Sequence, residues 1–166
     1  RDAAELFFVV YLLCLCAATV QVNSIEFRQD PVTLSRDRAD YVCIAEHELR
    51  LETRSPNGNI RFWMKQIIKN LNCSQLVVTR GRKGCAVCDK TGKFIQVPAF
   101  AQKVIDRVGA GDAFLSVSAL AAARNVPNEI LGFIGNVVGS LAVETIGNKK
   151  AIDKLSVQKY IVSLMK

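Results

Sequence analysis

Residues 106–114 read DRVGAGDAF, and they connect a short extended piece, predicted over 103–106, to an Ala- and Leu-rich helix predicted over 113–124. Gly109 and Gly111 let the backbone turn closely before the helix begins. The first amides of a helix have no partner within the helix, and the helix dipole adds positive potential there. The segment is therefore a candidate cradle for a phosphate group.

This cradle differs from two familiar phosphate-binding loops. The Gly-Lys-Ser/Thr of a P-loop does not follow it, and Phe114 stands where the dinucleotide fingerprint has its third glycine. The carboxylate of Asp112 would repel a neighbouring phosphate, unless its use is to accept the proton of a hydroxyl that attacks the phosphoryl group. On spacing alone, a helix N-cap is an equally good interpretation of Asp112.

The rest of the chain predicts an α/β layered fold. Four short apolar runs are predicted to be strands: 39–45, 75–79, 85–89 and 94–97. A polar turn or helix is predicted to begin at Glu46. Three further helices are predicted: an amphipathic one over 60–71, a largely buried one from about Pro127 to Ile146, and a last one from a Ser156 cap to Met165.

Two more features carry possible binding groups. The strand ending at Thr79 feeds the loop 80–84, RGRKG, whose amides and basic side chains suit a polyphosphate, although an ordinary basic turn is the simpler interpretation of the loop alone. Asn136 is a polar residue in an otherwise apolar helix, so it needs a hydrogen-bond partner when buried. A structural partner and a nucleotide base are equally good candidates.

Taken together, these segments resemble the ribokinase-like (pfkB) carbohydrate kinases. The sequence GAGD at 109–112, preceded by Asp106, is similar to the C-terminal motif of that family, although Arg107–Val108 replaces the commoner Thr-Thr. The resemblance implies an α/β/α fold and transfer of a phosphoryl group from ATP to a hydroxyl of a sugar or sugar phosphate.

The same resemblance implies roles for the motif residues. The amides of Gly109, Ala110 and Gly111 would form an anion hole for the transferring phosphate, and Asp112 would be the catalytic base.

The nucleotide site follows from the resemblance too. The run 77–85 is similar to the nucleotide loop of the family, which implies that Thr79 and Gly81 line the ATP site and that Gly84 opens the hairpin. The helix around Asn136 is similar to the one that borders the adenine. Gly147–Asn148 stands where the family closes its nucleotide and monovalent-cation loops.

The sequence matches the family's Asn-x-x-Glu motif only in part. Glu48 matches the Glu, but Ala45 replaces the Asn. Glu48 is a candidate magnesium residue acting through water, because Mg²⁺ keeps several waters and uses few carboxylates. The missing Asn puts full metal handling in doubt.

The resemblance covers about residues 39–166, which we expect to be the nucleotide-binding part of the kinase domain, with 1–38 a fragmentary N-terminal part of the same α/β core. We expect a fragment, because the parts that supply most of the sugar pocket in the family are not visible. Within the family, the sequence is most similar to modules related to bifunctional heptose-phosphate kinase/nucleotidyltransferase proteins. A homodimer is one possible assembly.

Composition narrows the class of protein. The 166 residues carry a formal net charge of +7, which suits an anionic partner, but the basic residues are scattered and only 7% of residues are aromatic, so we expect no nucleic acid to be bound. The apolar run 6–18 is shorter than a membrane span, and a buried segment is favoured over a signal. Cysteines without metal-site spacing favour a cytoplasmic protein with buried thiols.

Three other interpretations remain open. The simplest is a fragment that does not fold alone, because the run 6–18 has lost its packing partners. A degenerate kinase that binds nucleotide without transferring phosphate is favoured by Ala45 and by the missing acceptor half. A basic nucleic-acid-binding domain would instead bind polyanions tightly, with a steep dependence on salt.

Overall fold

The computed structural model describes residues 40–54, 58–145 and 152–166; the run 6–18, the proposed unit 1–38 and Gly147–Asn148 lie outside these. In chain order its elements are β1 (Tyr41–Ala45), α2 (Glu46–Glu52), α3 (Ile60–Leu71), β2 (Gln75–Thr79), the 3-10 turn η1 (Gly81–Lys83), β3 (Cys85–Asp89), β4 (Phe94–Val97), α4 (Ala110–Ala123), α5 (Asn128–Val143) and α6 (Lys154–Leu164).

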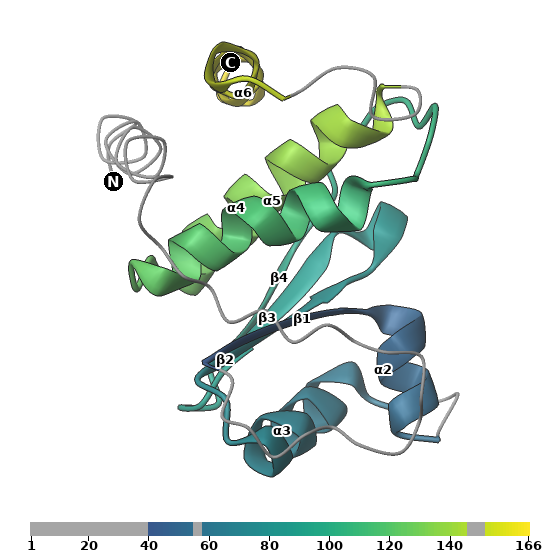
Figure 1. The fold of residues 1–166 in the computed structure, drawn as a ribbon, viewed down its shortest axis with the longest axis vertical. Coiled ribbons are helices and arrows are strands. Elements are labelled where there is room, and N and C mark those ends of the chain that lie inside the picture. Colours follow the sequence, from purple (N-terminus) through teal and green to yellow (C-terminus); the bar gives the residue numbers. More distant parts are fainter. Residues whose placement is uncertain (1–39, 55–57, 146–151) are drawn as a thin grey trace.

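The four strands form one sheet in the order β1-β2-β3-β4. Strand β1 runs parallel to β2, while β2, β3 and β4 are antiparallel neighbours. Helices α4 and α5 cover one face of the sheet, and α2 and α3 lie on the other (Figure 1). This arrangement confirms the predicted layered α/β/α fold.

Each face of the sheet has its own hydrophobic core, because side chains alternate along a strand. Leu76 and Val78 of β2 pack with the apolar stripe of α3, whereas Val77 between them packs on the side of α4 and α5. Cys85 and Cys88 of β3 also fall into opposite cores, and both thiols are free. The predicted interpretation of these cysteines as small buried residues is confirmed.

Helix α5 carries glycines where it packs against its neighbours, and these positions leave no room for a side chain. A Cβ atom at Gly132 would stand 2.8 Å from the Cγ2 of Val97, and one at Gly135 would stand 2.5 Å from the ring of Phe114 in α4. Within the described residues, no helix is both long and apolar enough to span a bilayer.

The structure corrects three predicted elements. Residues 103–106 are not a strand, because the amides of Ile105 and Asp106 both bond to the carbonyl of Val143 at the end of α5. Helix α5 ends at Val143, before the predicted Ile146. Helix α6 is capped by Asp153, whose carboxylate accepts a hydrogen bond from the Ser156 amide at 2.9 Å, so Ser156 is not its cap.

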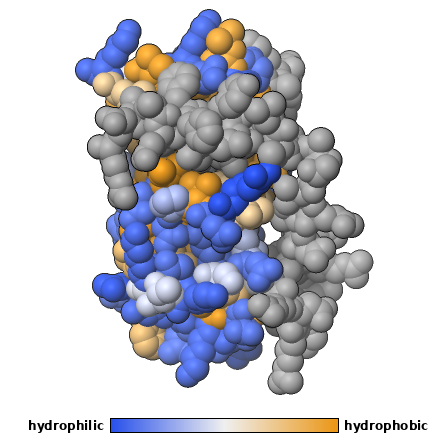
Figure 2. Space-filling view, turned by 90° about the vertical axis from the view of Figure 1, so that its left-hand side faces the viewer, coloured by the Kyte–Doolittle hydropathy of each residue, from blue (hydrophilic) through white to orange (hydrophobic). Residues whose placement is uncertain are grey.

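A hydrogen-bond network centred on Asp89 connects the elements at the end of the sheet where β2 begins and β3 ends. Its carboxylate accepts from the amides of Thr91 (2.9 Å) and Lys93 (3.2 Å) in the hairpin turn, and from Asn128 Nδ2 (2.8 Å) at the start of α5. Asn128 in turn accepts from Gln75 of β2. Figure 2 views the molecule from the side where β2 begins, and the lower part of its described surface is largely hydrophilic.

This network generates a prediction for stability. Burial opposes ionisation of Asp89, but hydrogen bonds from Thr91 and Asn128 lower its pKa below the ordinary value. A lowered folded-state pKa contributes stability above the unfolded-state pKa, and that stability is lost as the pH falls through the folded-state pKa. We expect Asp89→Asn to lower the free energy of unfolding by about 1–3 kcal/mol at pH 7. An asparagine oxygen can still accept from the turn amides, but the charge is removed and an NH2 group faces the Asn128 donor.

Urea unfolding at pH 7 and at pH 3 measures this effect, and the difference between wild type and variant should shrink at the lower pH. Glu129→Gln is the matched control, because the Lys93–Glu129 pair (2.8 Å) is about half exposed. Its loss should stay under about 1 kcal/mol. Equal losses in the two variants would show that Asp89 has no special structural role.

Candidate functional site

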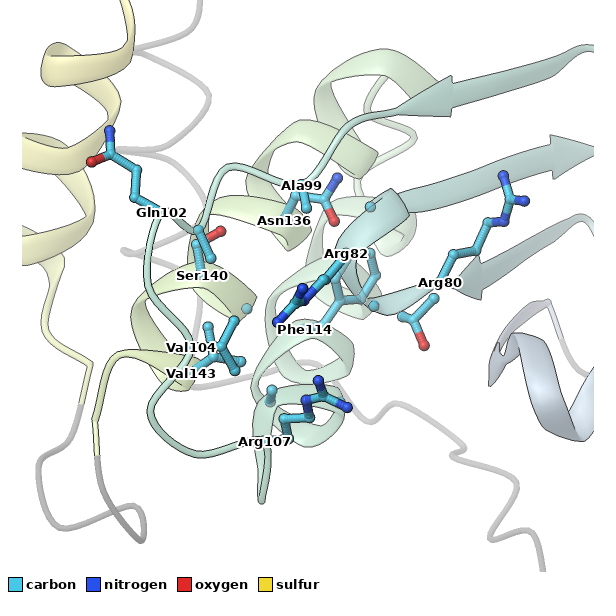
Figure 3. A pocket seen from close by; sticks show the side chains of 17 residues that line it. Arg80, Arg82, Ala99, Gln102, Val104, Arg107, Phe114, Asn136, Ser140 and Val143 are labelled. Carbon is cyan, nitrogen blue, oxygen red and sulfur yellow. The ribbon is translucent and has the colours of Figure 1, made fainter.

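A cleft of about 790 Å³ opens where four parts of the chain meet: the end of β2 with η1, the loop after β4, the first turn of α4, and one face of α5 (Figure 3). It is lined by Thr79, Arg80, Gly81, Arg82, Gly84, Ala99, Ala101, Gln102, Val104, Arg107, Ala110, Gly111, Phe114, Asn136, Gly139, Ser140 and Val143. The candidate residues from the nucleotide loop and from the GAGD segment thus reach one site, although they are far apart in sequence.

The loop after β2 is shaped by two glycines with different tasks. Gly81 has φ of +56°, and a Cβ there would meet nothing within 4 Å, so its backbone stands open to the cleft. Gly84 has φ of +82°, and a Cβ there would lie 2.0 Å from the carbonyl oxygen of Val97. Gly84 is therefore required for β3 to begin against the end of β4, which keeps the loop in place.

A partly buried carboxylate fixes the first residue of this loop. Glu46 accepts from Arg50 Nη2 at 2.7 Å and from Arg80 Nε at 3.2 Å. Burial opposes ionisation of Glu46, but the hydrogen bonds from Arg50 and Arg80 lower its pKa below the ordinary value. Arg80 is thus held beside the start of α2 and is not available as a freely moving cation.

The start of α4 has the geometry of an anion site. Gly109 is the N-cap with φ of +76°, a left-handed conformation that favours glycine. The first bond of the regular helical pattern runs from the Ala113 amide to the Gly109 carbonyl at 2.9 Å, so the preceding amides lie outside that pattern. The Ala110 amide makes one long bond, to the Arg107 carbonyl at 3.4 Å, which an anion would have to replace. A Cβ at Gly111 would meet nothing within 4 Å, so an anion can reach this backbone.

Asp106 and Asp112 flank this turn. Asp106 Oδ1 accepts from the Val108 amide at 3.0 Å, which shapes the loop just before Gly109. Asp112 lies exposed in the first turn of α4 and makes no capping hydrogen bond, since Gly109 occupies the N-cap position. The N-cap interpretation of Asp112 is therefore wrong. Asp112 and Gly109 adjoin the cleft through Ala110 and Gly111 but do not themselves line it.

Asn136 finds structural partners. Its buried Nδ2 donates to the carbonyls of Val97 (3.0 Å) and Pro98 (2.9 Å), which fixes the chain as it leaves β4. In Figure 3 its side-chain oxygen points toward the cavity. Asn136 therefore positions the loop that follows β4 while presenting an acceptor to the cleft.

Glu48 is not brought to the cleft. Its Oε2 accepts from the Ala45 amide at 2.6 Å, which caps the start of α2. Ala45 has no side-chain acceptor, so it cannot make the reciprocal bond of a complete capping box. Glu48 lies at the same end of the sheet as Thr79, because Ala45 is paired with Thr79 in the parallel register.

Several residues that line the cleft were not predicted from the sequence. Ser140 lies one helical turn after Asn136, so the i+4 spacing was a usable signal for it. Arg107 occupies a position where the resemblance departs from Thr, which was also a signal. Gln102 and Val104 come from an irregular loop, and its path depends on the long-range bonds to Val143, so the sequence held no local sign of them.

Part of this chain is similar in sequence to known carbohydrate kinases and related proteins. The chain matches the pfkB family carbohydrate kinases over residues 15–155, a match that begins upstream of residue 39. Inositol 3-kinase of Arabidopsis thaliana is 40% identical over 94 residues, covering 55% of this chain and 25% of that protein. Bifunctional protein HldE of Histophilus somni is 35% identical over 82 residues, covering 49% and 17%. The chain thus spans a quarter or less of the length of these relatives.

Solved structures share the same architecture over part of their length. Escherichia coli phosphofructokinase-2 in complex with potassium superposes with a TM-score of 0.68 at 23% identity, covering 78% of this chain and 42% of that one. Arabidopsis thaliana ribokinase complexed with ribose and ATP gives 0.66 at 28% identity, covering 76% and 42%. The match over most of the sequence and the shared fold lead to one conclusion: the chain belongs to the pfkB family of carbohydrate kinases.

Proposed function

We propose that this chain is the nucleotide-binding part of a kinase that transfers the γ-phosphoryl group of ATP to a hydroxyl of a sugar or sugar phosphate. The observation that carries the proposal is that the loop 79–84 and the first turn of α4 line the same cleft. A second support is the similarity, at 28% identity, to a ribokinase whose structure holds ribose and ATP.

In this reaction the two sides of the cleft have different tasks. The backbone of Thr79 and Gly81 would contact the nucleotide, and the amides at Ala110 and Gly111 would stabilise charge on the phosphoryl oxygens. Asp112, exposed beside them, would accept the proton of the attacking hydroxyl. The oxygen–phosphorus bond to the acceptor forms as the bond between the β- and γ-phosphates breaks, which leaves ADP.

A requirement for Mg²⁺ would suit a site in which the phosphates of the nucleotide provide most of the metal's ligands. Among the described residues, no group of three or more His, Cys, Asp or Glu side chains could hold an ion. Mg²⁺ tolerates such a site, because it keeps several waters and uses substrate phosphates as ligands. When bound, it would neutralise phosphate charge, with Glu48 a candidate to contact its waters.

A non-catalytic nucleotide-binding module is the second candidate. It is favoured by Ala45 in place of the family's Asn and by Glu48, whose carboxylate is occupied by the Ala45 amide. Such a module would bind ATP in the same cleft without transferring phosphate, even with the acceptor half present.

Gly111→Val tests whether the cleft binds ATP at the start of α4. The valine side chain has room at this exposed position, so the fold should be kept while access to the amides is blocked. We expect the Kd for Mg·ATP, measured by isothermal titration calorimetry, to rise at least about tenfold, or roughly 1.4 kcal/mol. Asp112→Asn, in the same turn, should not raise the Kd, because it removes a carboxylate that repels phosphate. Equal binding by wild type and Gly111→Val would place the nucleotide elsewhere.

Asp112→Asn tests the phosphotransfer step itself. In the full-length protein, assayed against a panel of sugars, sugar phosphates and inositol, kcat should fall by roughly 10²–10⁴-fold, since an amide cannot accept the hydroxyl proton. The KM for ATP should change little. Undiminished turnover in the variant would remove Asp112 from the mechanism, while ATP binding without turnover in the wild type would favour the non-catalytic module.

A further inference from the structure

Arg107 stands at a position where the family commonly has threonine, and none of the roles proposed above uses its side chain. It lies on the loop before α4, two residues ahead of Gly109, and its side chain is exposed. It nevertheless lines the cleft, at the end where α4 begins (Figure 3). A long cationic side chain therefore stands beside the candidate anion hole.

A second arginine lines the same cleft from the other side. Arg82 belongs to η1, and Figure 3 shows its guanidinium projecting over the cavity, while the side chain of Arg80 points away. Arg80 is paired with Glu46 at 3.2 Å. Neither Arg82 nor Arg107 forms an ion pair with another of the described residues.

The charged side chains that line the cleft are all cationic, although Asp106 and Asp112 flank the turn that begins α4. The described lining of the cleft includes three arginines and neither Asp nor Glu. The start of α4 adds the positive end of the helix dipole. Two guanidinium groups without carboxylate partners keep their donors available, and the planar fork of arginine matches a phosphate better than lysine does. An elongated anion with several phosphate groups suits such a cleft.

We propose that Arg82 and Arg107 form a two-armed phosphate clamp that makes this cleft select nucleoside triphosphates over diphosphates and monophosphates. The proposal rests on the proposed function and deepens it. Arg107, beside the turn that begins α4, contacts the terminal phosphate of the nucleotide. Arg82, on the turn after β2, contacts the phosphates nearer the ribose.

Because the two arginines would contact different phosphates, replacing each one should change the Kd values for ATP, ADP and AMP in a different pattern. The measurement is titration calorimetry with ATP, ADP and AMP, each with Mg²⁺. Arg107→Gln should raise the Kd for ATP about tenfold or more, because one charge-assisted contact is lost. It should change the Kd for ADP far less. Arg82→Gln should weaken ATP and ADP alike, and neither variant should affect AMP as strongly. Arg107→Lys should recover only part of the ATP affinity.

Two lysines provide matched controls. Lys83 shares η1 with Arg82, and Lys103 shares the loop of Arg107, but both are exposed and neither lines the cleft. Lys83→Gln and Lys103→Gln remove the same unit of charge, so they should change the ATP affinity by less than about twofold at physiological salt, where distant charges are screened.

Several outcomes would overturn the clamp. If the lysine variants lost as much ATP affinity as the arginine variants, the net charge of the protein would explain the loss. An equal loss of ATP, ADP and AMP in Arg107→Gln would place this arginine away from the terminal phosphate. ATP binding by wild type that neither arginine affects would refute the clamp and leave the proposed function standing. Failure of the folded wild type to bind any of the three nucleotides would refute both.

Discussion

Helix α5 holds both ends of the segment that connects the sheet to the start of α4, and the cleft depends on this restraint. Near its middle, Asn136 donates to the carbonyls of Val97 and Pro98 as the chain leaves β4. At its end, the Val143 carbonyl accepts from the amides of Ile105 and Asp106. The glycines of α5 allow this close approach, because a side chain at Gly132 or Gly135 would collide with its neighbours. The first turn of α4 is thereby held opposite the loop that follows β2.

Local patterns were enough to predict most of the secondary structure. One helix and three strands have the predicted bounds: Ile60–Leu71, Gln75–Thr79, Cys85–Asp89 and Phe94–Val97. Their signals, which are alternation, helical periodicity and glycine turns, depend only on residues that are neighbours in the sequence. Residues 103–106 have the composition of a strand but bond to a helix end 37 or more residues away, and no local pattern encodes such a partner. Similarly, Asp153 and Ser156 are both good caps by type, and only the geometry of the turn distinguishes them.

Sequence patterns predicted several of the residues that line the cleft, but not the contacts that place them there. The glycines at 81, 84 and 111 and Asn136 all reach the cleft, yet they do so for different reasons: Gly84 and Asn136 are tied to the end of β4, while Gly81 and Gly111 leave open backbone. For the three glycines, a motif cannot separate these reasons, because both require the same residue type. Glu48 shows the converse, since a residue that matches a motif is occupied by a local backbone bond.

The four described cysteines are distributed over both layers of the molecule. Cys73 and Cys88 lie in the core of α3, and Cys85 lies in the core of α4 and α5 with Cys43 packed against it. Burial raises the pKa of Cys43 and Cys85 to about 12 and that of Cys73 to about 11, so at neutral pH these thiols are scarcely ionised. Alkylation of the buried thiols of Cys73, Cys85 and Cys88 therefore requires local unfolding of the layer that holds each one. The order of labelling would show which of the two layers unfolds locally more often.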